Sequence, residues 1–300
     1  MPKTASTLTS IFDHPRFKWV DMIASTVQEK AGGLLRTEPF GPELKSLLNG
    51  TPLRHRLHPM LVDVPVGAWT TACYLDALST LTNGRRKRQF QEGADAAIAL
   101  GIIGSLPAAL TGMADWVDVS GKPRRYGMIH ALLNVTALAG YSVSLAARRG
   151  DSRNQALALT SAGIGFAAMS LSASIGGDLV YNLGVNVPGR PGLSPPEEFT
   201  YVLDSSNLPP GGQRMVKAGD LPVLLVRDDD GELHALEHWC THAGAPLSEA
   251  EIENGVITCH WHGSQFCVAD GAPMRGPAAT PLTVYAVREE AGRIMVGPPA

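Results

Sequence analysis

Three stretches of this chain contain no aspartate, glutamate, lysine or arginine: residues 96–114, 127–147 and 155–177. About 18 to 20 such residues, wound as a helix, cross the hydrocarbon layer of a bilayer. Helices of a soluble bundle would keep charged residues on their outer faces, and these stretches have none. The sequence therefore predicts membrane-spanning helices, although a net charge of −3 and a mean hydropathy of +0.02 are ordinary for a soluble chain.

A fourth apolar stretch, residues 61–82, is interrupted only by Asp63 and Asp76. Small residues recur at four-residue intervals in these segments, which lets helices approach closely in lipid. They are Ala97, Gly101, Ser105 and Ala109 in one segment, and Ser161 and Gly165 in another. We expect a four-helix transmembrane bundle over residues 56–182, preceded by a polar and amphipathic N-terminal segment, residues 1–55.

Two short runs near the C-terminus mix cysteine with histidine: Cys240-Thr-His242 and Cys259-His-Trp-His262. Two thiolates and two imidazoles suit a [2Fe–2S] cluster in which one iron carries both sulfurs and the other both histidines. The same donors could hold tetrahedral zinc. Zinc-finger spacing usually begins with paired cysteines, whereas each run here pairs one cysteine with one histidine. The spacing therefore favours the iron–sulfur cluster.

The residues around these ligands carry a family resemblance. Cys-Thr-His-Ala-Gly-Ala-Pro-Leu and Cys-His-Trp-His-Gly-Ser-Gln-Phe, with Gly276-Pro277-Ala278 further on, resemble the Rieske ferredoxin family over about the last third of the chain. The resemblance implies an all-β head that transfers single electrons. It also implies that a third loop shields the cluster and that a serine hydroxyl tunes it. The implied site residues are Cys240 and Cys259 on one iron, His242 and His262 on the other, Pro277 as the shield and Ser264 as the tuning group.

Within this family, three positions distinguish the chain from the quinol-oxidising type. That type joins its ligand loops by a disulfide, and Ala245 and Trp261 stand at the two cysteine positions. Phe266 stands where a tyrosine hydroxyl would donate to a ligand cysteine, and such outer donors tune a metal centre. The head therefore resembles the lower-potential ferredoxins that serve oxygenases. We expect a reductase or an oxygenase as redox partner, with quinone as the alternative.

The C-terminal third is expected to be all-β. Residues 183–198 are rich in proline and glycine, which is typical of an extended linker. Beyond them, short β-prone runs alternate with turns such as Glu-Asn-Gly, which are hairpin signals. We therefore expect an all-β head domain over residues 199–300. The expected strands are Phe199–Leu203, Leu221–Arg227, Leu233–Leu236, Val256–Cys259, Gln265–Val268, Leu282–Arg288 and Arg293–Val296.

Polar residues gather at one end of the expected bundle. His58 and His130 open the first and third helices at similar depth, so they could ligate a b-type haem from opposite sides. A quinone site built from His130, Asp63 and Asp115 is a second reading, and either would make the chain a multi-centre oxidoreductase. A third is that these groups hydrogen-bond to one another and to headgroups. His-Pro, Gly-Met-Ala-Asp-Trp and Gly-Gly-Asp elements resemble an uncharacterised family of four-helix bacterial membrane proteins over residues 55–182.

The two other cysteines, Cys73 and Cys267, are expected to be buried packing residues. With two of four cysteines assigned to metal, no disulfide framework is available.

The remaining signals concern the location of the protein. The basic run over residues 85–88 suits lipid headgroups rather than nucleic acid. Lysine and arginine divide almost evenly between the two membrane sides, so the positive-inside rule gives no orientation. Because clusters are assembled in the cytoplasm, we expect a multi-pass cell-membrane protein with a cytoplasmic head.

Overall fold

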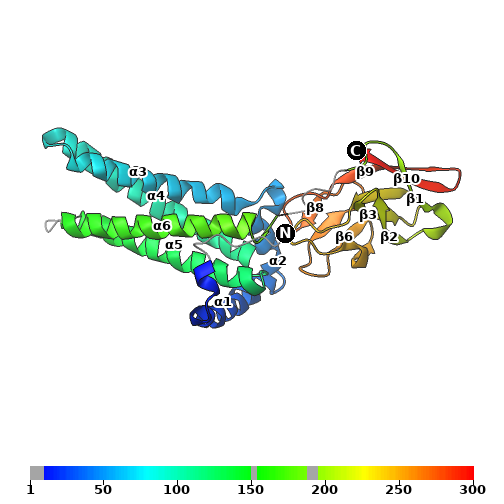
Figure 1. Cartoon of the computed structure of the whole chain (residues 1–300), viewed down its shortest axis with the longest axis horizontal. Coiled ribbons are helices and arrows are strands. Elements are labelled where there is room, and N and C mark those ends of the chain that lie inside the picture. Colours follow the sequence, from blue (N-terminus) through cyan, green and yellow to red (C-terminus); the bar gives the residue numbers. More distant parts are fainter. Residues whose placement is uncertain (1–9, 150–153, 188–194) are drawn as a thin grey trace. The chain divides into compact units, whose positions relative to one another are not determined.

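The computed structural model describes residues 10–149, 154–187 and 195–300. The chain divides into two compact units (Figure 1). One contains residues up to Leu34 together with Leu57–Val185, and it is helical. The other joins Leu35–Arg56 to Asn186–Ala300. The bundle thus begins one residue after the expected start at residue 56, but the expected N-terminal segment is divided, with Leu35–Arg56 belonging to the unit of the C-terminal head.

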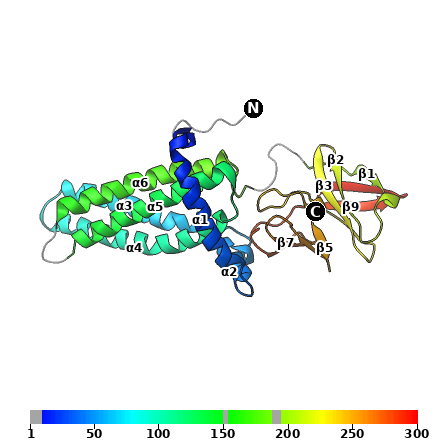
Figure 2. The same cartoon turned by 90° about the horizontal axis from the view of Figure 1, so that it is seen from below.

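Four long helices form the bundle of the first unit and run side by side (Figure 2). They are α3 (Leu57–Thr80), α4 (Gly84–Trp116), α5 (Gly121–Ala147) and α6 (Gln155–Tyr181). Short connections make α3 and α4 one hairpin and α5 and α6 another, and each hairpin packs tightly along its length. The Asn154 side chain caps α6 by accepting from the Leu157 N–H. The expected up-and-down bundle is confirmed.

The expected count of four membrane helices differs from the structure. Among the described residues, α1 (Lys18–Arg36) and α2 (Gly41–Asn49) precede the bundle, giving six α-helices in the N-terminal part. By length and composition, three helices are apolar enough to cross a membrane: α4, α5 and α6. The first expected span, α3, forms but does not meet that criterion. Its two aspartates are the charged residues of this segment, and Asp76 is buried inside the bundle.

The two hairpins repeat one another. Trp69 on α3 and Tyr141 on α5 lie 72 positions apart and stack with ring centroids 4.5 Å apart. Gly101 on α4 lies against the Trp69 ring, and Gly165 on α6 lies against the Tyr141 ring in the same way. A residue that contacts its own counterpart in a repeat must lie near the axis relating the two copies. The hairpins therefore pack about an approximate two-fold axis that passes between α3 and α5.

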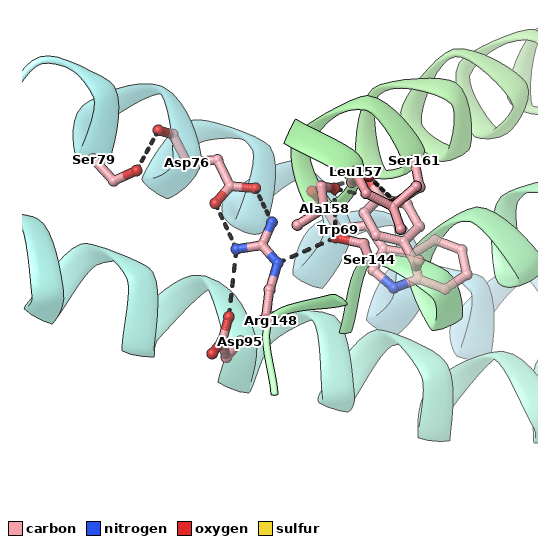
Figure 3. Close-up of polar contacts among 10 residues, drawn as sticks. Trp69, Asp76, Ser79, Asp95, Ser144, Arg148, Leu157, Ala158 and Ser161 are labelled. Atoms are coloured by element: carbon pink, nitrogen blue, oxygen red, sulfur yellow. Dashed lines mark hydrogen bonds and ion pairs between the residues drawn. The ribbon is translucent and has the colours of Figure 1, made fainter. Parts of the chain in front are cut away.

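An ion pair lies on the same axis at one end of the bundle (Figure 3). Arg148 follows α5, 72 positions after Asp76 of α3, and donates two hydrogen bonds to its carboxylate at 2.8 and 2.5 Å. Asp95 on α4 lies 3.4 Å from the same guanidinium. Arg148 and Asp76 side chains are each only 9% exposed. The repeat has thus placed opposite charges at equivalent positions, where each neutralises the other inside the bundle.

Helix α1 packs across the bundle on its apolar face. Val20 and Ala24 are buried against Tyr126 of α5 and Ile175 of α6. Asp21 accepts two hydrogen bonds from Arg125 at 2.9 and 2.5 Å. This bidentate hydrogen bond holds the pKa of the Asp21 carboxyl below its usual value. The amphipathic character expected for the N-terminal segment is confirmed over α1.

The head consists of two antiparallel sheets. A six-stranded sheet has the order β1-β10-β9-β4-β3-β2, and a four-stranded sheet has the order β5-β6-β7-β8. The strands are β1 Thr200–Asp204, β2 Gln213–Ala218, β3 Leu221–Arg227, β4 Leu233–Glu237, β5 Glu251–Glu253, β6 Val256–Thr258, β7 Gln265–Cys267, β8 Pro273–Arg275, β9 Val284–Glu290 and β10 Arg293–Pro299. Leu224 and Leu236 of the large sheet share one core with Ile257 and Phe266 of the small sheet. The all-β class is confirmed.

Three strands were not expected from the sequence. β2 shows no regular alternation of polar and apolar residues, and it pairs along its whole length with β3. β5 and β8 are three residues long, and β8 begins at Pro273, which suits a sheet edge rather than its interior. Part of the expected linker, residues 188–194, lies outside the described residues.

Candidate metal centre

The two cysteine–histidine runs fold into loops with the same pattern of backbone hydrogen bonds. The Cys240 N–H donates to the Ala245 carbonyl and the Gly244 N–H donates back to the Cys240 carbonyl, both at 2.8 Å. In the second loop, the Cys259 N–H donates to Ser264 O at 2.8 Å and the Gly263 N–H to Cys259 O at 2.9 Å. Gly244 and Gly263 have φ values of 74° and 72°, which favour glycine. Each loop is thus a tight turn that leads directly from cysteine to histidine.

The four expected ligand side chains converge between these loops. Cys240 and Cys259 are each 1% exposed and lie over the core shared by the two sheets. The Nδ1 atoms of His242 and His262 lie 3.2 Å apart, and the rings are nearly perpendicular at 89°. His242 is buried, whereas His262 is half-buried at the edge of the site. Sulfurs lie at the inner end and imidazoles toward the surface, which is the donor set of a cluster with one sulfur-bound and one nitrogen-bound iron.

The loop backbone also favours negative charge on the sulfurs. A hydrogen bond from the Cys240 thiol, together with the N–H groups of Trp261 and His262, lowers the pKa of the Cys259 thiol to about 6. The neighbouring Cys259 and burial raise the pKa of Cys240, against the effect of the His242 and Ala243 N–H groups. Backbone donors aimed at sulfur stabilise thiolate and reduced-cluster charge alike. The pocket therefore fits an anionic, sulfur-ligated metal centre.

A third loop, residues 276–280, covers the two ligand loops. The Ala278 N–H donates to the Ser264 hydroxyl at 3.0 Å, and the Thr241 hydroxyl donates to the Thr280 carbonyl at 2.6 Å. Pro277 is buried between these contacts. Because Ser264 accepts from the third loop, its own hydroxyl hydrogen is left to donate elsewhere in the site. The structure thus brings Ser264 and Pro277 to the same loop cluster as the four ligands.

The third loop is also held from its outer side by α2 and the following turn η3 (Thr51–Leu53). Ser46 on α2 accepts from the Gly276 N–H at 2.8 Å, and the buried Thr51 hydroxyl donates to the Ala278 carbonyl at 2.9 Å. A Cβ at Gly276 would lie 2.6 Å from Thr51 Oγ1, so only glycine fits there. Sequence reasoning missed this layer. The segment lies more than 200 positions away in the chain, and its short amphipathic helix gives no sign of which surface it covers.

In the helical unit, His58 and His130 come together at the end opposite to the Asp76–Arg148 pair. Their ring centroids are 6.5 Å apart and the rings are nearly perpendicular, at 83°. The structure therefore brings together the two histidines that the sequence singles out. Of the two aspartates considered with them, Asp115 is buried on α4 whereas Asp63 is exposed on α3.

The two other cysteines differ from expectation. Cys73 is exposed on the outer face of α3, so its prediction as a buried packing residue was wrong. An apolar outer face is what a helix next to lipid presents, and the sequence pattern does not separate that face from the bundle interior. Cys267, in β7, is partly buried.

Comparison with known families agrees with this division of the chain. A family model described as a Rieske [2Fe–2S] domain matches residues 198–286, and a second, described as a predicted membrane protein (DUF2231), matches residues 54–189. The fold and site thus define a Rieske iron–sulfur protein with a fused membrane domain.

Individual relatives are similar to the head alone. Ferredoxin CarAc of Metapseudomonas resinovorans is 36% identical over 32% of this chain and 89% of the relative. The ferredoxin component of biphenyl 2,3-dioxygenase from Rhodococcus jostii is 34% identical over 33% of this chain and 91% of the relative. The solved ferredoxin of carbazole 1,9a-dioxygenase from Nocardioides aromaticivorans is 29% identical over 34% of this chain and 99% of that chain, with a TM-score of 0.32. The chain belongs to the Rieske [2Fe–2S] ferredoxin family and carries a [2Fe–2S] cluster.

Proposed function

We propose that this protein is a membrane-anchored carrier that relays single electrons between a reductase and an oxygenase. The observation that carries the proposal is the convergence of two buried cysteines and two histidines, with His242 and His262 Nδ1 atoms 3.2 Å apart. Cys240 and Cys259 would hold one iron, and His242 and His262 the other. When bound, the cluster supplies a one-electron centre with a potential between about −150 and +300 mV.

The surrounding residues would set the properties of that centre. Ser264, which is fully buried, would donate its remaining hydroxyl hydrogen toward the cluster and raise its potential. Pro277 would exclude water from one side. Phe266 fills the core position where a hydroxyl donor would otherwise raise the potential further. With one potential-raising hydroxyl donor near the cluster instead of two, the potential would be lower than in the quinol-oxidising type. This supports a ferredoxin-like carrier rather than a protein that oxidises quinol.

Electrons would enter and leave at the histidine edge. His262 is half-buried there, and its neighbour Trp261 is 52% exposed. A large exposed aromatic side chain is a common anchor for a partner protein. Two relatives are ferredoxin components of oxygenase systems by name. That supports a partner of the same kind here, a reductase or an oxygenase.

The proposal also includes the placement of the two domains relative to the membrane. The helices α4, α5 and α6, together with α3, would cross the bilayer as a multi-pass anchor, with the head in the cytoplasm where clusters are assembled. Protease added to sealed, right-side-out vesicles is then expected to spare the head and to digest it only after the membrane is opened. Digestion in intact vesicles would place the head on the outer side.

The electron route is tested by reducing the cluster in native membranes and following it by electron paramagnetic resonance. An NADH-linked reductase is expected to reduce the cluster, and a quinol is expected to leave most of it oxidised. Rapid reduction by quinol would contradict the ferredoxin-like proposal. A cluster that neither donor reduces would favour a redox sensor over a carrier.

A further inference from the structure

The membrane domain holds a second pair of histidines that the cluster does not use. His58 near the start of α3 and His130 on α5 are counterparts in the hairpin repeat, like Trp69 and Tyr141, and they also meet at the two-fold axis. Two rings with centroids 6.5 Å apart leave room for one metal ion bound at about 2 Å by each. We propose that His58 and His130 are the two axial ligands of a haem iron in the bundle. The proposal concerns the membrane domain and does not depend on the function of the head.

The hydrogen bonds of both rings fix their protonation. His58 Nδ1 lies 2.9 Å from the Ala108 carbonyl, and His130 Nδ1 lies 2.9 Å from the Ser172 carbonyl. A carbonyl oxygen only accepts, so each Nδ1 carries the proton and each neutral ring keeps its lone pair on Nε2. A metal-binding histidine almost always donates its other N–H to such a carbonyl or carboxylate. Both rings are therefore oriented and protonated as metal ligands are.

Glycines let the backbones of α4 and α6 approach the two rings closely. A Cβ at Gly112 on α4 would lie 2.7 Å from His58 Cε1, and one at Gly176 on α6 would lie 3.3 Å from His130 Cε1. Glycines thus stand beside both imidazoles at matching places in the two hairpins. Although they lie between helices, both rings are only half-buried. The Asn134 amide lies 3.0 Å from His130 Nε2 and donates to its lone pair, so this side chain would turn away when the same lone pair binds iron.

The chemistry of the surroundings favours haem over the two other candidates. A bare zinc or copper ion takes further strong protein ligands. Among the described contacts of these rings, the other groups are two carbonyls, the Ser172 hydroxyl and the Asn134 amide. Haem needs only two axial ligands, because the porphyrin supplies four nitrogens. A quinone oxygen accepts hydrogen bonds, and both imidazole N–H groups are already committed to carbonyls.

The test uses the full chain purified in detergent from cells supplied with a haem precursor. The expected result is one haem per chain, with the absorption spectrum of six-coordinate low-spin iron. Nearly perpendicular imidazole planes are also expected to give a highly anisotropic low-spin resonance signal, distinct from that of the cluster. His58→Ala and His130→Ala should each abolish the six-coordinate spectrum. His55→Ala, at an exposed position before α3, should leave it unchanged.

The cluster signal of the same samples shows that the head of each variant is folded, and unchanged helix content and elution volume show the same for the bundle. Absence of haem from wild-type protein with a full cluster signal would overturn the proposal. So would an unchanged six-coordinate spectrum in both alanine variants. If an alanine variant does not fold, His58→Met and His130→Met replace it, since methionine can also ligate haem iron. Each should shift the spectrum in wavelength, and an unshifted spectrum in both would again contradict the proposal.

Discussion

At the scale of single residues, the cluster pocket depends on contacts made far from the ligands in sequence. Thr51 shows this, because its hydroxyl is the described donor to the buried carbonyl of Ala278, 227 positions away. Ala278 in turn donates to Ser264, beside the second ligand loop. The third loop is therefore held on both sides by side-chain hydroxyls.

Replacing Thr51 by valine keeps the shape of the side chain and removes this hydrogen bond. A buried carbonyl left without its donor costs about 1–3 kcal/mol. We expect Thr51→Val to lower the temperature at which the cluster bleaches and to speed its loss to an iron chelator several-fold. Thr51→Ser should restore both, and Thr26→Val, on the exposed face of α1, serves as the control. Equal chelation rates in Thr51→Val and wild-type protein would show that this contact is unimportant.

The histidine ligands should control the potential through their charge. In His242→Cys a neutral imidazole is replaced by an anionic thiolate, so the oxidised cluster gains a negative charge and accepts an electron less readily. Protein-film voltammetry is expected to give a lower midpoint potential for a variant that still holds a cluster. An unchanged or raised midpoint would contradict assignment of His242 as an iron ligand.

Glu237, at the end of β4, should make head stability depend on pH. Burial raises the pKa of its carboxyl above the usual 4.5, and hydrogen bonds from Thr283 only partly offset this. The folded state therefore favours the protonated form, and that contribution is complete below the unfolded pKa and is lost as pH rises through the folded pKa. Glu237→Gln mimics the protonated form. Its bleaching temperature should exceed that of wild-type protein at about pH 7 and match it near pH 4; Glu251→Gln, on an exposed strand, should show no such divergence.

At the scale of helices and strands, the sequence was most informative where a pattern is local. Uncharged runs identified α4, α5 and α6, and short β-prone runs between turns identified β3 and β9. The turn signal Glu-Asn-Gly correctly marked the start of β6, although β5 before it was not expected. Contacts between segments distant in the chain could not be predicted from local patterns. The strand β2 is stabilised by pairing with β3 along its whole length, and α2 packs against the third loop at Gly276. The hairpin repeat leaves little trace in the sequence, because His58 recurs as His130 but Trp69 and Asp76 correspond to Tyr141 and Arg148.

Helix packing gives a matched pair of glycine substitutions. A Cβ at Gly101 would lie 2.2 Å from Trp69 Nε1, whereas one at Gly163 would meet nothing within 4 Å. Gly101→Ala is therefore expected to destabilise the bundle by about 1–3 kcal/mol through overpacking. Gly163→Ala should be neutral or slightly stabilising, since alanine favours helix more than glycine does. Thermal unfolding in detergent measures both, and equal stability of the two variants would mean that α4 does not pack on Trp69 as described.

At the scale of the whole molecule, two units with different chemistry are joined in one chain. The head is a Rieske domain, and it matches relatives such as ferredoxin CarAc over about nine tenths of their own length. Here it is fused to a membrane domain and carries α2 and η3 as an additional layer over the third loop. A carrier of this kind would exchange electrons only with partners that reach the membrane surface.

The central claim is that Cys240, His242, Cys259 and His262 together hold a two-iron cluster. Metal analysis of anaerobically purified protein, combined with electron paramagnetic resonance after dithionite reduction, tests it most directly. The expected result is two irons per chain and the signal of a mixed sulfur- and nitrogen-ligated cluster, both lost in Cys259→Ser. Stoichiometric zinc with negligible iron, and no signal on reduction, would contradict it.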